Sequence, residues 1–193
     1  FIGFEWSAGQ LVKDQDTFKI SHNHRVVIYK DDAKKANQVF PLSLYDSADP
    51  EDLWHYLEGY ENKTGGNVLA IPHNGNLSGG KMFATEDFFG RPISRHYAQT
   101  RMRWEPLYEV TQTKGDSETH RFLSPVDEFA DFEKWTANKY KVGSNRLNEY
   151  ARAVLKLGLK QQVELGFNPF KFGMIGSTDS HTGLSAVAED NYI

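Results

Sequence analysis

The chain has 193 residues, of which 39% are hydrophobic and 25% are charged, an ordinary composition for one globular domain with a real core. Its formal net charge of -4 argues against a general nucleic-acid binder, so we expect the partner to be a small molecule. Because the chain has no cysteine, disulfides, cysteine nucleophiles and thiolate metal sites are excluded, and any metal must bind through His, Asp and Glu.

The first predicted element is a buried strand, which the chain enters at once without an initiator Met. We therefore expect residues 1–193 to be the C-terminal portion of a longer single domain. Short runs rich in β-branched and aromatic residues predict strands at residues 2–6, 25–29, 67–71, 107–111 and 172–176. Long surface or lid loops are expected at residues 30–41 and 112–142.

Helical patterns separate most of these strands. Asp49 followed by Pro50 is typical of a helix start, and apolar residues then recur at helical spacing until Gly65. A shorter helix is predicted over residues 94–103. Neither a run of about 18 apolar residues nor a signal-peptide pattern is present, so we expect no membrane segment in this stretch.

The longest helix is predicted to begin near Ser144 or Asn145 and to end at Gly166. Its buried side is expected to carry Leu147, Ala151, Val154 and Leu155. Strand and helix thus mostly alternate, which predicts an α/β fold with a largely parallel sheet or barrel.

Groups that suit metal binding or proton transfer lie near the end of most of the predicted strands or just after it. They are Glu5, His73, Glu109, Asp179 and His181. In parallel α/β folds, side chains at the carboxyl ends of strands converge on one face. His24 precedes its strand, so it would have to come from a strand running the other way or from the loop after Glu5 folding back. Asp179 and His181 point the same way if their backbone is extended, and such a pair suits zinc, manganese or iron.

Each of these residues also has a purely structural interpretation. A strand-end Asp or His usually caps the next helix or bonds to backbone, and the Asn-Gly after His73 is equally typical of an ordinary turn. Glu5 lies between Phe4 and Trp6, so if it is buried it needs a cation or a hydrogen-bonding cluster.

Other polar residues are less informative. We expect His22, His55 and His96 to be surface or helix-face residues, and His120 to lie in a solvated polar loop. An anionic substrate could be neutralised by Arg25, Arg101, Arg103 or Lys114, although such residues usually face water.

Taken in chain order, the candidate ligands resemble the motifs of the PHP superfamily, the polymerase and histidinol phosphatase type of metal-dependent phosphoesterase. Phe-Glu5-Trp resembles its strand-end Glu that bridges two metals, and His24-Arg-Val-Val-Ile-Tyr resembles its His at the start of the following strand. Ile-Pro-His73 and Asp179-Ser-His181 resemble its third and fourth motifs. The opening His-x-His motif of the superfamily has no counterpart, so the chain would carry only part of the site.

Three longer segments resemble one particular group within that superfamily. Residues 104–112, 123–133 and 168–181 are similar to the sequences of a bacterial group, domain of unknown function 3604, so the resemblance spans nearly all of the chain. It implies a distorted β/α barrel of PHP type, present here as a partial barrel that lacks its N-terminal strands. A compartment in either the bacterial cytoplasm or the periplasm fits this resemblance, and the oligomeric state stays open.

The resemblance also implies a metal-dependent hydrolase, phosphoesterase-like, in which two or three divalent ions (zinc, manganese or iron) polarise an ester and activate water. Glu5 would bridge metals, His24 and His73 would hold one ion, and Asp179 and His181 would complete the others. Asp179 would also orient the water, and Glu109 would fix a ligand imidazole or contact the substrate. A hydrolase of C-N or carboxylic ester bonds and a non-catalytic PHP-like binding module are the alternatives.

Overall fold

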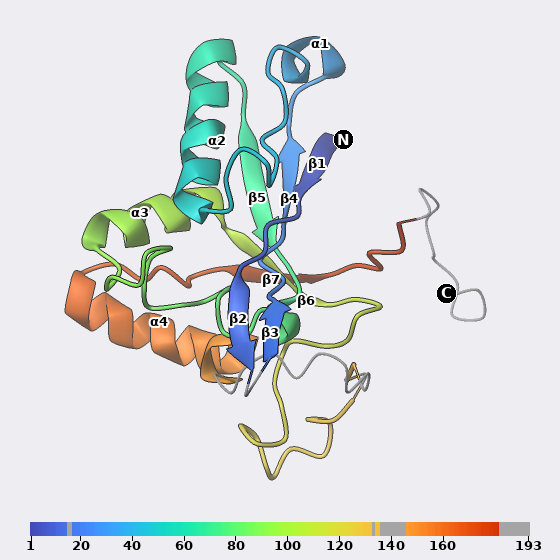
Figure 1. The fold of residues 1–193 in the computed structure, drawn as a ribbon, viewed down its shortest axis with the longest axis vertical. Helices are drawn as coiled ribbons and strands as arrows, with labels where there is room; N and C mark the ends of the chain where they lie inside the picture. The colour runs from blue at the N-terminus through green and yellow to red at the C-terminus, as the bar shows by residue number, and fades with distance from the viewer. Residues whose placement is uncertain (15–16, 133, 136–145, 182–193) are drawn as a thin grey trace.

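The computed structural model describes residues 1–14, 17–132, 134–135 and 146–181, which form a mixed α/β fold (Figure 1). Its strands are β1 Ile2–Trp6, β2 Leu11–Asp14, β3 Thr17–Ile20, β4 Arg25–Tyr29, β5 Val68–Pro72, β6 Leu107–Thr111 and β7 Gly173–Gly176. Its helices are α1 Ala33–Ala36, α2 Pro50–Thr64, α3 Arg95–Trp104 and α4 Ala151–Leu165, with short 3-10 helices η1 Gly75–Leu77 and η3 Arg146–Asn148. None of the helices in these ranges has the length and apolarity that crossing a membrane requires.

The five predicted strands are confirmed as β1, β4, β5, β6 and β7. Three of them have the predicted bounds, β5 is shifted by one residue, and β7 starts one residue late. Local composition suffices here because β-branched and aromatic residues fit a pleated, half-buried surface. The hairpin of β2 and β3, which lies between β1 and β4 in the sequence, was not predicted.

The capping residues define α2 and α3 as predicted. The side chain of Asp49 accepts a hydrogen bond from the backbone N–H of Glu51, and α2 ends at Gly65, whose φ of 61° is left-handed. The hydroxyl of Ser94 accepts from the backbone N–H of Tyr97 at 3.1 Å and so caps α3. Both helices are therefore fixed by local sequence signals.

Helix α4 begins later than its predicted start, which lies outside the described residues. It follows the separate turn η3, because Tyr150 between them has extended backbone with φ -119° and ψ 133°. Ala151 and Val154 are buried as predicted, and Leu155 is half-buried. Leu147 is 59% exposed, so its predicted place on the buried side is wrong. It belongs to η3, and the break at Tyr150 ends the helical spacing on which that prediction depended.

The prediction of a largely parallel arrangement is wrong for the main sheet. Strand β4 lies between β1 and β5 and is antiparallel to both, so β1 and β5 run in the same direction. Strands β6 and β7 form a separate parallel pair. Within the described residues the sheets are small and no closed barrel is formed.

The connection between β4 and β5 explains the antiparallel order. Residues 37–49 carry the chain back along the sheet before α2 returns it to the end at which β4 finished (Figure 1). Tyr60, near the end of α2, donates a hydrogen bond to Asp31, which lies two residues after the end of β4. A helix between two adjacent strands implies parallel strands only when it is the single long passage between them.

Two hydrophobic clusters form the core. The larger one lies between the β1–β4–β5 sheet and helices α2 and α3, and it includes Trp6, Val27, Leu53, Trp54 and Leu57. The second lies between β6 and α4 and includes Phe83, Tyr108, Val154 and Phe170. The strands that carry the candidate ligands are therefore backed by packed side chains.

A buried charge cluster ties the sheet to both helices. Glu105 accepts hydrogen bonds from Nε of Arg25 at 3.0 Å and from Nε1 of Trp54 at 2.9 Å, and its other oxygen lies 2.9 Å from Arg101. Burial raises the pKa of Glu105, but the charges of Arg101 and Arg25 and the bond from Trp54 together hold it below its ordinary value. The carboxylate is therefore ionised in the core.

Glu105→Ala should remove the partner of two buried guanidinium groups and lower the free energy of unfolding by about 3–5 kcal/mol. Urea unfolding followed by circular dichroism measures this loss. Glu61→Ala is a matched control because Glu61 pairs with Arg103, which is 57% exposed, and such surface pairs contribute about 0–1 kcal/mol. Equal losses in the two variants would contradict the role assigned to Glu105.

Candidate metal centre

The antiparallel sheet brings three candidate ligands to one edge. Glu5 lies near the end of β1, opposite Val26 in β4. His24 directly precedes β4 and His73 directly follows β5, and the backbone N–H of His73 donates to the carbonyl of His24 at 3.3 Å. Because β4 runs opposite to its neighbours, its first residues lie beside their last ones. Of the two routes considered for His24, the strand running the other way is the observed one.

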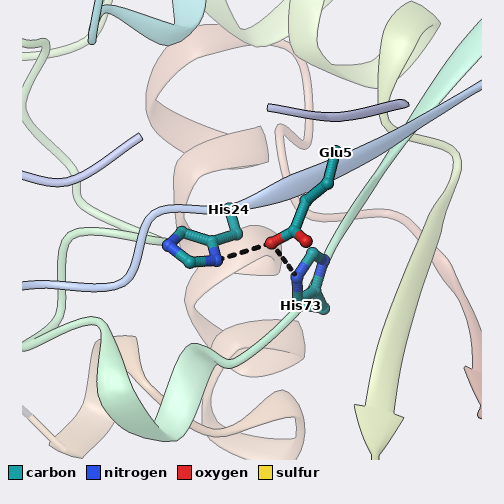
Figure 2. A group of neighbouring side chains, drawn as sticks. All are labelled: Glu5, His24 and His73. Carbon is teal, nitrogen blue, oxygen red and sulfur yellow. Dashed lines mark hydrogen bonds and ion pairs between the residues drawn. The ribbon is translucent and has the colours of Figure 1, made fainter. Parts of the chain in front are cut away.

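Glu5 faces both imidazole rings (Figure 2). Its Oε1 atom lies 2.7 Å from Nδ1 of His24 and 3.3 Å from Nε2 of His73. Ligand atoms around a tetrahedral ion with bonds of about 2.1 Å lie about 3.4 Å apart. The 3.3 Å separation matches this value, whereas the 2.7 Å separation is that of a hydrogen bond and would have to widen to admit an ion. Hydrogen bonds with His24 and His73 hold the pKa of Glu5 well below its ordinary value, so its carboxylate is ionised at neutral pH.

The buried ring of His73 is oriented by the backbone. Its Nδ1 lies 3.5 Å from the carbonyl oxygen of Ile71, where only a protonated nitrogen can donate. With Nδ1 donating to this carbonyl, Nε2 faces a Glu5 oxygen and needs either a proton or a metal ion between the two atoms. A carbonyl that fixes one ring nitrogen while the other faces a cation is typical of metal-ligating histidines.

A second group of ligand atoms shares Glu5. The Oε2 atom of Glu5 lies 3.7 Å from Nε2 of His181, and Nδ1 of His181 lies 3.3 Å from Oδ1 of Asp179. Glu5, Asp179 and His181 each offer one ligand atom within 4.8 Å of the others, as Glu5, His24 and His73 also do. Four of the other predicted site residues are thus gathered near the carboxylate of Glu5.

Asp179 and His181 lie in a tight turn after β7. Their φ angles are 52° and 56°, in the left-handed region that residues other than glycine rarely adopt. The extended backbone on which we based their common direction is therefore wrong. The turn itself directs both side chains, since Nδ1 of His181 contacts the carbonyl oxygen of Asp179 at 2.6 Å and Nε2 is left facing Glu5. Such strained turns are common where side chains must be held for function.

Glu109 supports this turn from β6. It is buried and lies beside Ile175 in the parallel pair of β6 and β7. Its Oε2 atom accepts a hydrogen bond from the hydroxyl of Ser177 at 2.7 Å, and the backbone N–H of Ser177 donates to Thr111. Glu109 therefore positions the segment that leads to Asp179. Its predicted contact with a ligand imidazole or a substrate stays a prediction.

His22 is the residue that sequence reasoning missed. It is half-buried, and its ring centroid lies 4.9 Å from that of His24. Burial, together with the charges of His24, Lys114 and His73, lowers the pKa of His22 to about 4, so the ring is neutral at pH 7. The spacing His22-Asn23-His24 was the available signal, because alternate residues of an extended segment share a face.

The remaining candidates lie away from the two groups. His55 and His96 are exposed on α2 and α3, as predicted. His120 is half-buried, where its ring stacks on Phe122 and Nε2 lies 3.0 Å from Arg146. It belongs to the internal packing of the loop that begins at residue 112, whose described part contains turns and neither helix nor strand.

The comparisons with known proteins give a family and no activity. The family described as "Protein of unknown function (DUF3604)" matches residues 1–193, the whole of the chain. No curated protein and no solved structure matches the chain.

The depressed pKa of Glu5 predicts a pH-dependent contribution to stability. This contribution is fully present above the unfolded pKa of about 4.5 and is lost as the pH falls toward the folded value. The experiment is done with metal removed by a chelator. Glu5→Gln should then lower the free energy of unfolding by less at pH 4 than at pH 6, and the two losses should differ by about 0.5–1 kcal/mol. Urea unfolding at the two pH values measures the change.

The control for this experiment is Glu58→Gln, which removes one half-exposed carboxylate on α2. Its effect on unfolding should change little between the two pH values. A Glu5→Gln effect that stays constant between pH 6 and pH 4 would contradict the ionised, imidazole-bound state of Glu5.

Proposed function

The chain belongs to the DUF3604 family, and on that premise we propose that it supplies part of a metal-dependent hydrolase with a site of two or three divalent ions. The observation that carries the proposal is the shared carboxylate of Glu5, which faces imidazole nitrogens on both of its oxygens. The ligands come from both ends of the chain, and clusters of ionisable groups with perturbed pKa values are typical of functional sites.

The donor set favours particular ions. Nitrogen and carboxylate oxygen ligands without any thiolate suit zinc, manganese or iron. His24 and His73 would hold one ion with Glu5, and Asp179 and His181 would hold another with the second oxygen of Glu5. A bound divalent ion supplies Lewis acidity that polarises an ester and lowers the pKa of water.

The residues of the chain have distinct tasks in this proposal. Glu5 brings a permanent negative charge, because its low pKa keeps it ionised. Asp179 would orient the attacking water and accept its proton, and Glu109 and Ser177 hold the turn from which Asp179 projects. The backbone carbonyl of Ile71 keeps the Nε2 lone pair of His73 available.

We further propose that the family is part of the PHP superfamily and that the substrate is a phosphoester. The order Glu5, His24, His73, Asp179 and His181 along the chain supports the first point. The strand ends that carry Glu5 and His73 point to the same edge, as the β/α barrel of that superfamily would require. The substrate class follows from the superfamily alone, so it is the part that a substrate panel must test.

Metal content provides the first test. In the complete protein that carries this chain, Glu5→Gln should weaken the binding of both ions at least about 100-fold, because one carboxylate serves both groups. His73→Gln should weaken only the first ion, and Asp179→Asn only the second. Elemental analysis after dialysis against a weak chelator measures the number of ions retained.

Two exposed histidines provide the controls for metal content. His55→Gln and His96→Gln should retain every ion, since neither residue lies in a ligand group. Full metal retention in both His73→Gln and Asp179→Asn would contradict the assignment of the site.

Activity provides the second test. Asp179→Asn should lower kcat toward an aryl phosphate by about 100- to 10,000-fold, the usual contribution of general acid–base catalysis. A panel of an aryl phosphate, a carboxylic ester and an amide, each assayed with zinc and with manganese, measures the substrate class. Hydrolysis of the amide or carboxylic ester alone would contradict the phosphoester proposal and leave the metal site standing.

A further inference from the structure

A lysine, Lys114, lies beside the second ligand group, which consists of Glu5, Asp179 and His181. The ammonium of Lys114 pairs with Oδ2 of Asp179, whose other oxygen faces His181. The side chain of Lys114 is 28% exposed, so it is reachable from solvent and is still held against the site. The pair is partly open to solvent, where ion pairs contribute little to stability.

The backbone of Lys114 is tethered to the loop that follows His73. Its carbonyl accepts a hydrogen bond from the side-chain amide of Asn76 at 3.0 Å. The hydroxyl of Ser117 in turn donates to the side-chain oxygen of Asn76 at 2.8 Å. The start of the Lys114 loop is thus fixed to the segment that carries one ligand of the first group.

The same loop is tethered to the segment that carries the second group. The backbone N–H of Thr113 donates to the carbonyl of Thr178 at 3.2 Å, one residue before Asp179. The side-chain oxygen of Gln112 accepts from the backbone N–H of Lys114 at 3.1 Å and sets the local turn. Lys114 therefore lies between the two ligand-bearing loops, with its own carbonyl bonded to the first and the N–H of the adjacent Thr113 bonded to the second.

The other basic residues considered for an anionic substrate are engaged elsewhere. Arg25 and Arg101 are buried against Glu105, and Arg103 pairs with Glu61 on the surface of α2. Among these four candidates, Lys114 is the one beside the ligand atoms.

We propose that Lys114 binds an anionic oxygen of the substrate next to the second ligand group, and that the substrate therefore carries a phosphate-like oxyanion. This inference rests on the proposed metal site. An ion on Asp179 neutralises that carboxylate and removes the present partner of Lys114. A compact ammonium on a flexible stem can then move to an anion held beside the ions, while its backbone stays fixed.

The test is binding of inorganic phosphate to the metal-loaded complete protein by calorimetry, without reference to turnover. Lys114→Met, which keeps the length of the side chain and removes its charge, should weaken phosphate binding by about 10- to 100-fold. Lys114→Arg should restore binding to within about threefold of the wild type, because it keeps the charge. Unchanged phosphate binding in Lys114→Met, or an equal loss in Lys114→Arg, would overturn the inference.

Metal content of the same samples separates this inference from the proposed function. Lys114→Met should bind its ions as tightly as the wild type or more tightly, since a tethered cation no longer competes for Asp179. Full metal content with unchanged phosphate binding would overturn the role of Lys114 alone, whereas a wild type that takes up no ion would overturn both proposals.

The phosphate-binding experiment has a control variant and a control ligand. Lys81→Met is the control, because Lys81 is exposed and its described hydrogen bond is made by its backbone N–H. It should leave phosphate binding unchanged, and a loss equal to that of Lys114→Met would overturn the inference. Acetate in place of phosphate tests the oxyanion class, since a loss in Lys114→Met that is confined to acetate would overturn the assignment of a phosphate-like group.

Discussion

The antiparallel pairing of β4 between β1 and β5 is the constraint on which the rest of the site depends. It places the first residues of one strand beside the last residues of its two neighbours. Glu5, His24 and His73 meet for that reason alone, although 68 residues separate the first from the last. A parallel order of the same strands would carry His24 to the far end of the sheet.

The buried charge cluster of Arg25, Arg101 and Glu105 holds the start of β4 in place. Arg25 follows His24 directly, and its guanidinium donates both to Glu105 and to the backbone carbonyl of Asn23 at 2.8 Å. Glu105 also accepts from Trp54 in α2, so the start of β4 is anchored to the helical layer. A buried ion pair is weak evidence for net stability, but it strongly specifies where its partners lie. Here it specifies the position of a candidate ligand.

In both ligand groups the carboxylate is paired with a nitrogen group of the chain. Glu5 is surrounded by imidazoles, which keep it ionised, and Asp179 is matched by Lys114. Both carboxylates therefore have cationic or hydrogen-bonding partners in the chain itself, as buried charges require. Divalent ions would displace these partners, because an ion binds each carboxylate more strongly than an imidazole or an ammonium does.

The sequence by itself determined strands β1, β4, β5, β6 and β7, helices α2 and α3, and the identity of the candidate ligands. Strand bounds, the caps Asp49 and Ser94, and the ligand types could be read locally, because propensity and capping act within a few residues. The half-burial of His22 and the break at Tyr150 that leaves Leu147 exposed were seen only in the structure. Strand direction was also decided there, because it depends on contacts between distant segments. These long-range contacts arise from the return path of the chain over residues 37–49, which no local pattern encodes.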